Sequence, residues 1–127
     1  MKRSAALLVL VLLAFPLAAL AAGSASIGVA AEGKDPSSRV SGVAARAPYF
    51  LLFDGKGTLV EAVANPHKDV RGGAGTQVVD LLAGKGVKAV VAGEFGPRMI
   101  DAMKGRGMRY LTFQGSATDA VKTALAK

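Results

Sequence analysis

Residues 65–82, with the sequence NPHKDVRGGAGTQVVDLL, hold the only histidine of the chain, a basic loop and a glycine cluster. A neutral imidazole can ligate an exposed metal of a cluster, so His67 is a candidate metal or cluster ligand. A lone histidine cannot form a mononuclear site, and Asp69 or Glu94 would be the nearest carboxylates to assist it. A solvated loop histidine without any ligand is the alternative interpretation.

Glycines in two segments suit an anionic ligand. Each segment precedes a predicted helix, where unpaired backbone N–H groups and the positive end of the helix dipole favour negative charge. Glycine also lets a ligand approach the backbone closely. A flexible turn ahead of a helix is the competing interpretation of the same residues. The candidate anion- or cluster-binding residues are Arg71, Gly72, Gly73, Gly75, Gly93, Glu94, Gly96 and Arg98, with Lys34, Arg39 and Lys68 as further basic residues expected around His67.

Hydrophobic periodicity predicts the elements that position these residues. Short apolar runs are typical of strands, and apolar residues at helical spacing are typical of helices. The DGKG segment between the second and third runs predicts a hairpin. The order is βββαβαβα, which predicts a single α/β domain with a mixed five-stranded sheet and about three helices. The predicted strands cover residues 24–31, 49–53, 59–63, 87–93 and 108–113, and the helices cover residues 75–86, 96–107 and 116–127.

The predicted topology brings the candidate residues to one edge of the sheet. If the first, third and fourth strands run the same way, their C-terminal ends meet there, together with the loop after Ala31 and the loops at residues 65–73 and 93–96. Ligands of α/β proteins commonly bind at the carboxyl ends of parallel strands. The methionines Met99 and Met103 lie at helical spacing and are interpreted as core.

The N-terminus has the features of a signal peptide, which we assign to residues 1–21. Lys2 and Arg3 precede an apolar run over residues 5–20, and Ala19 and Ala21 fit the small-residue rule for cleavage. We therefore expect an exported, periplasmic protein whose domain covers residues 24–127, without stable membrane insertion after cleavage. An uncleaved N-terminal anchor is the alternative.

Composition excludes several classes of site. The chain has no cysteine, which excludes disulfides, zinc–thiolate sites and cysteine-ligated iron–sulfur clusters. Of 16 Lys and Arg residues two would leave with the signal peptide, and 9 Asp and Glu residues then give a net charge of about +5. No basic run is interleaved with aromatic residues, so nucleic acid is not an expected partner. We expect a monomer.

Several segments in a fixed order carry a family resemblance: RAPYFLLFD, NP, GGAG, and VVDLLAGKGVKAVVAGEFGPRMIDAMKGRGMRYL. Together they resemble the dinitrogenase iron–molybdenum cofactor biosynthesis family, which includes NifX-like proteins and the C-terminal domain of NifB. The resemblance covers residues 27–125 and includes residues 46–50, 72–75 and 93–96. Two features depart from it: Ala44 and Ala45 stand where many relatives have phenylalanine and glycine, and most members are not exported.

The resemblance implies a ribonuclease H-like fold and a non-catalytic carrier of a metal cluster or metal-containing anion. The cargo would be an iron–molybdenum, iron–sulfur or other metal-sulfide cluster, not ligated by cysteine. One alternative is an interaction module of the cell envelope that uses the fold without a ligand and docks onto a protein partner. A ribonuclease H-type nuclease is less favoured, because such enzymes need clustered carboxylates and the first predicted strand has none.

Overall fold

The computed structural model describes residues 24–127, so the predicted signal peptide lies outside the described residues. The observed order confirms the predicted βββαβαβα arrangement and adds a short 3-10 helix, η1, that the sequence pattern did not predict. The elements are β1 (Ile27–Ala31), η1 (Ala44–Arg46), β2 (Tyr49–Phe53), β3 (Leu59–Ala64), α2 (Ala74–Gly84), β4 (Ala89–Ala92), α3 (Pro97–Gly105), β5 (Arg109–Thr112) and α4 (Ala117–Ala126).

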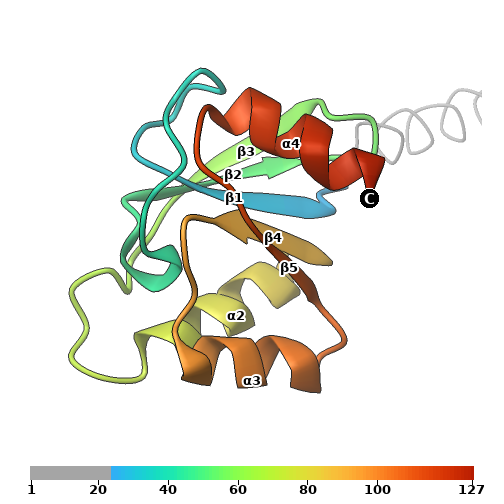
Figure 1. Cartoon of the computed structure of the whole chain (residues 1–127). Helices are drawn as coiled ribbons and strands as arrows, with labels where there is room; N and C mark the ends of the chain where they lie inside the picture. The colour runs from blue at the N-terminus through green and yellow to red at the C-terminus, as the bar shows by residue number, and fades with distance from the viewer. Residues whose placement is uncertain (1–23) are drawn as a thin grey trace, which may run out of the picture.

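The five strands form one mixed sheet in the order β3-β2-β1-β4-β5. Strand β1 is parallel to β4, which is parallel to β5, and β2 is antiparallel to both β1 and β3. Helices α2 and α3 cover one face of the sheet, and α4 covers the other (Figure 1). This is the single mixed-sheet α/β domain that was predicted.

Apolar residues pack on both sides of this sheet. Strand β4 is buried along its whole length because β1 and β5 flank it and helices lie over both faces. Met99 and Met103 are fully buried in the cluster between the sheet and the helices α2 and α3, which confirms their assignment to the core. Ser116 caps α4, since its Oγ accepts a hydrogen bond from the Asp119 N–H at 3.1 Å.

The β2–β3 hairpin forms at the predicted DGKG turn. The Asp54 carboxylate accepts hydrogen bonds from the backbone N–H groups of Thr58 and Lys56, each at 2.9 Å. These bonds, with that from Thr58 the larger cause, hold the pKa of the Asp54 carboxyl below its ordinary value of 3.8.

The connections that follow β1, β3 and β4 lie together on the left of Figure 1. All three strands run in the same direction, so their C-terminal ends share one edge of the sheet. The predicted gathering of loops is therefore observed. None of the helices within residues 24–127 has the length and apolar content needed to cross a bilayer.

Candidate anion-binding site

A pocket of about 370 Å³ opens where α2 and α3 begin, at the edge of the sheet described above. It brings together five of the predicted residues: Gly72, Gly73, Gly75, Gly96 and Arg98. The remaining lining residues are Val43, Ala45, Arg46, Ala74, Pro97 and Met99.

Both helices present free N-termini to this pocket. The N-cap residues are Gly73 and Gly96, and no side chain caps either helix. Neither helix has an acidic residue in its first turn. The first-turn N–H groups of a helix have no intrahelical acceptor, so here they are open to an external anion.

Glycine stands at the pocket positions for different physical reasons. Gly72 and Gly73 have φ values of 68° and 76°, a region that other residues adopt at a cost. A Cβ on Gly75 would lie 2.9 Å from the Met99 Cβ, so this glycine permits the close approach of α2 and α3. Gly96 has an ordinary φ of −72°, and a Cβ there would meet no atom within 4 Å. Neither a positive φ nor a close contact therefore requires glycine at position 96, where glycine is the N-cap of α3 and leaves the backbone uncovered.

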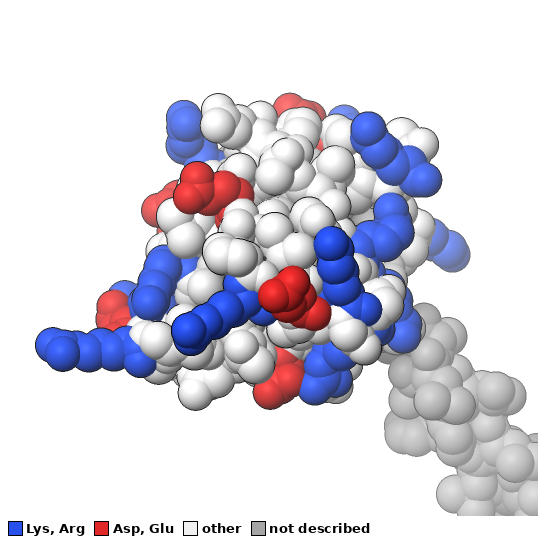
Figure 2. Space-filling view, turned by 60° about the horizontal axis from the view of Figure 1, so that its bottom comes forward, with Lys and Arg blue, Asp and Glu red and all other residues white. Residues whose placement is uncertain are grey.

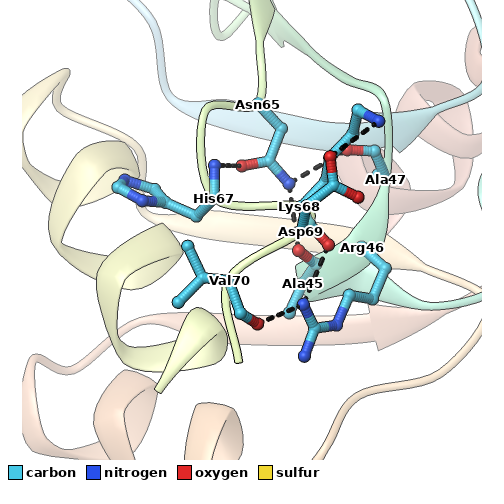
Figure 3. A network of polar contacts seen from close by, with 8 residues as sticks. All are labelled: Ala45, Arg46, Ala47, Asn65, His67, Lys68, Asp69 and Val70. Carbon is cyan, nitrogen blue, oxygen red and sulfur yellow. Dashed lines mark hydrogen bonds and ion pairs between the residues drawn. The ribbon is translucent and has the colours of Figure 1, made fainter. Parts of the chain in front are cut away.

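Arg46 and Asn65 hold the loop that forms one wall of the pocket (Figure 3). Asn65 is buried, and its Nδ2 donates to the carbonyl oxygens of Ala45 and Ala47 at 3.0 and 2.9 Å. Nη1 of Arg46 donates to the Lys68 and Val70 carbonyl oxygens at 2.8 and 2.6 Å. The loop is thus tied to η1 and the residue that follows it, by Asn65 at its start and by the Lys68 and Val70 carbonyl groups in its middle.

Arg46 therefore has a second role beside its position in the pocket lining. The resemblance includes Arg46 at the entry to the second predicted strand but implies no partner for it. The resemblance includes Asn65 in the NP segment but not its role, because its partners at Ala45 and Ala47 lie far from it in the sequence.

The structure places His67 apart from this pocket. Its backbone N–H donates to Asn65 Oδ1 at 2.9 Å, and its imidazole points away from Arg46 (Figure 3). It lines a shallow hollow with Gln77, Asp80 and Leu81. Neither Asp69 nor Glu94, the carboxylates expected to assist His67, lines that hollow.

A second pocket, of about 550 Å³, contains Gly93 and Glu94, two of the three remaining predicted residues. It lies between the segments that follow β1 and β4, where the chain turns to opposite sides of the sheet. A Cβ on Gly93 would lie 2.8 Å from the backbone of Gly42, so this glycine lets the two segments touch. The pocket also contains Glu32, Arg39, Val40, Gly42, Gln114 and Gly115.

The other basic residues are dispersed. Arg39 lies in the second pocket, Lys34 lies 5.8 Å from the ring centre of Tyr49, and Lys68 pairs with Asp69 at 3.3 Å. Arg71 is exposed and lines neither pocket. On the face that carries α2 and α3, Asp and Glu side chains lie among the Lys and Arg side chains (Figure 2). The charge of this face is therefore mixed.

The hydrogen-bond donors that line the pocket suit a ligand that already contains its metal. Within residues 24–127, no three His, Asp or Glu side chains are grouped so that they could hold a metal ion. Backbone N–H groups and guanidinium groups bind the outer oxygen or sulfur atoms of an anion, without metal–protein bonds.

Residues 25–127 match the sequence profile of the family described as dinitrogenase iron-molybdenum cofactor. The chain belongs to this family. The predicted resemblance is thereby confirmed across nearly all the described residues. No curated protein that was compared with the chain matches it.

Two solved structures are similar to this family member. The orange protein from Desulfovibrio gigas, in its apo form, is 25% identical with a TM-score of 0.75, over 81% of this chain and 88% of that one. A Thermotoga protein proposed to be NifB is 34% identical with a TM-score of 0.68, over 79% of this chain and 86% of that one.

Proposed function

We propose that this family member is a non-catalytic carrier of a metal-containing anion or metal-sulfide cluster of the iron–molybdenum cofactor type. The cargo would bind in the pocket at the start of α2 and α3 and would supply its own metal and sulfide. Family membership supports the class of cargo. The description of the orange protein as an apo form supports a protein of this fold that takes up a ligand.

One observation carries the proposal: two uncapped helix N-termini converge on a pocket that also contains Arg46 and Arg98. Each N-terminus is equivalent to about half a positive charge, and the guanidinium groups add donors for the outer atoms of the cargo. Gly96 leaves room for a ligand against the backbone where no internal constraint requires it.

Uptake of a defined probe tests this proposal. The domain of residues 24–127 would be incubated with tetrathiomolybdate, with an iron–sulfur cluster precursor or with copper salts, then desalted and analysed for its metal content. Retention of a molybdenum-containing species in a fixed ratio to protein is the expected result. Absence of any metal after desalting, in both native and reconstituted protein, would refute the carrier role.

We further propose that the domain acts after export to the periplasm, following cleavage of residues 1–21. The basic and apolar segments at residues 2–3 and 5–20 support this location. Mass spectrometry of the protein from fractionated cells tests it. A periplasmic form that begins near residue 22 is expected, whereas a full-length cytoplasmic form would argue against export.

A further inference from the structure

Strand β5 is an edge strand with one side of its backbone unpaired. The Arg109 N–H donates to the Lys88 carbonyl oxygen at 2.8 Å, and the Phe113 N–H donates to the Ala92 carbonyl oxygen at 3.0 Å. Because successive residues of a strand direct their backbone groups to opposite sides, the N–H and C=O groups of Tyr110 and Thr112 point away from β4. The open edge therefore offers two donors and two acceptors to another strand.

An apolar hollow of about 350 Å³ lies beside this edge, on the face of the sheet that α4 covers. Leu111 is only partly buried there, whereas the ring of Tyr110 packs against Phe95 on the face that carries α2 and α3. A side chain from a strand added beyond β5 could enter the hollow. Its lining consists of Ala89, Val91, Met108, Arg109, Tyr110, Leu111, Ala124 and Lys127.

Two basic residues line the hollow, and a third lies next to Arg109 in the sheet. Lys88 immediately precedes β4, Arg109 begins β5, and Lys127 follows α4, with Arg109 and Lys127 in the lining itself. The ion pairs of residues 24–127 involve other basic residues, so these three have no acidic partner there. A second copy added antiparallel at this edge would place its own basic residues at the far end of the paired strands and would leave Arg109 and Lys127 without acidic partners. Charge complementarity therefore favours an acidic partner.

The opposite edge of the sheet is less suited to such pairing. The register between β2 and β3 shifts at Leu52 and Phe53, and irregularities of this kind interrupt strand addition. On β3, Glu61 already pairs with Lys85 at 3.2 Å. By contrast, β5 keeps a regular register with β4 over its four residues.

We propose that β5 is a docking site for an extended peptide segment of a partner protein, which adds as a sixth strand. The segment has alternating apolar residues, one of which fills the hollow, and acidic residues that face Lys88, Arg109 and Lys127. This surface is separate from the anion pocket and lies at the opposite ends of the strands.

Fluorescence anisotropy with synthetic peptides tests the docking site. The probes are fluorescein-labelled heptapeptides of alternating valine and threonine, with two aspartates at either the N- or the C-terminus, and matched versions with lysine in place of aspartate. Either aspartate peptide should bind, and its affinity should fall as salt rises. The lysine peptides should bind at least tenfold more weakly. Amide signals of Tyr110, Leu111 and Thr112 should shift in NMR spectra of the complex.

Matched variants separate the backbone and charge contributions. Thr112→Pro removes an outward N–H that no internal bond uses, so it should leave the fold intact and weaken binding roughly tenfold. Thr112→Val keeps that N–H and should bind as the wild type does. Arg109→Glu should weaken binding strongly, whereas Lys34→Glu, with the same change in net charge at the other end of the strands, should not.

Three outcomes would overturn the proposal. No binding of either aspartate peptide at millimolar concentration would do so, as would binding that Thr112→Pro leaves unchanged. Sedimentation that reveals a dimer of the wild type, but a monomer of Thr112→Pro, would assign the edge to a second copy of this chain instead.

Discussion

Arg98 occupies a position in which its charge opposes the stability of its own helix. It lies in the first turn of α3, where the positive end of the helix dipole disfavours a cation by about 0.3–1 kcal/mol. A basic residue at such a position is understandable if it faces an anion, and Arg98 lines the proposed anion pocket.

Replacement of Arg98 by glutamate should therefore change stability and binding in opposite directions. Without ligand, Arg98→Glu should raise the free energy of unfolding by roughly 0.5–1 kcal/mol, because it removes an unfavourable charge and adds a favourable one. Tetrathiomolybdate affinity should fall at least tenfold. Urea unfolding and equilibrium dialysis provide the two readouts. Lower stability together with unchanged affinity would contradict the assigned role.

Two glycines of the same pocket provide a matched pair of variants. Gly75→Ala would place its Cβ 2.9 Å from the Met99 Cβ and should destabilise the fold by about 1–3 kcal/mol. Gly96→Ala meets no atom within 4 Å at a φ of −72°, so it should cost no more than about 1 kcal/mol, the difference between glycine and alanine at an N-cap. Its larger effect should be on ligand affinity. Full affinity in this variant, measured by calorimetry, would mean that no ligand approaches Gly96.

At the scale of the elements, the loop after β3 depends on one buried side chain. Asn65→Ala would remove the donors to the Ala45 and Ala47 carbonyl oxygens and should cost roughly 2–4 kcal/mol of stability. Because this loop leads into the pocket, anion affinity should fall as well. The control is Asp69→Ala, at an exposed ion pair, which should change stability by no more than about 0.5 kcal/mol. A thermal midpoint of Asn65→Ala equal to that of the wild type would contradict this role.

The β2–β3 hairpin should weaken in acid. The pKa of Asp54 is lowered in the folded state, so its contribution to stability is present above the unfolded value and is lost as pH falls through the folded value. The gap in thermal midpoint between the wild type and Asp54→Ala should therefore be full at neutral pH and should close below pH 3.8. An NMR titration of the Thr58 amide would follow the protonation of Asp54. A difference in thermal midpoint that does not change with pH would contradict this role of Asp54.

Element boundaries were predictable where the local signals agree. The strand at residues 49–53 matches β2, because its apolar run ends at a strong turn signal, and the Ser116 cap marks the start of α4. The helix η1 was missed, since a turn of three residues has no periodicity to detect. The predicted strands at residues 24–31, 87–93 and 108–113 are longer than β1, β4 and β5, because apolar residues continue beyond the ends of strand pairing.

At the scale of the whole molecule, strand direction was sufficient to predict that the loops share one edge. The sequence did not indicate which face of the sheet each loop would cover. That division depends on packing: Gly75 against Met99 brings α2 and α3 together, and Gly93 against Gly42 joins the segments after β1 and β4. As a result Gly93 and Glu94 line one pocket, His67 lines another hollow, and five predicted residues share the pocket with Arg46.

The position of His67 bears directly on the mode of binding. If the cargo is recognised as an anion by helix N-termini and guanidinium groups, His67→Ala should leave tetrathiomolybdate affinity within about twofold of the wild type. Its free energy of unfolding should change by no more than about 0.5 kcal/mol, since the side chain lies in a loop. A large loss of affinity in this variant would assign the metal to the histidine and would refute anion recognition.

The most direct test of the central claim is isothermal titration calorimetry of residues 24–127 with tetrathiomolybdate, run in parallel on the wild type, Arg98→Glu and His67→Ala. We predict saturable binding at one site in the wild type and in His67→Ala, a loss of at least tenfold in Arg98→Glu, and weaker binding at higher salt. Heat of binding that is absent from the wild type, or equal in the wild type and Arg98→Glu, would contradict an anion-carrying pocket at the start of α2 and α3.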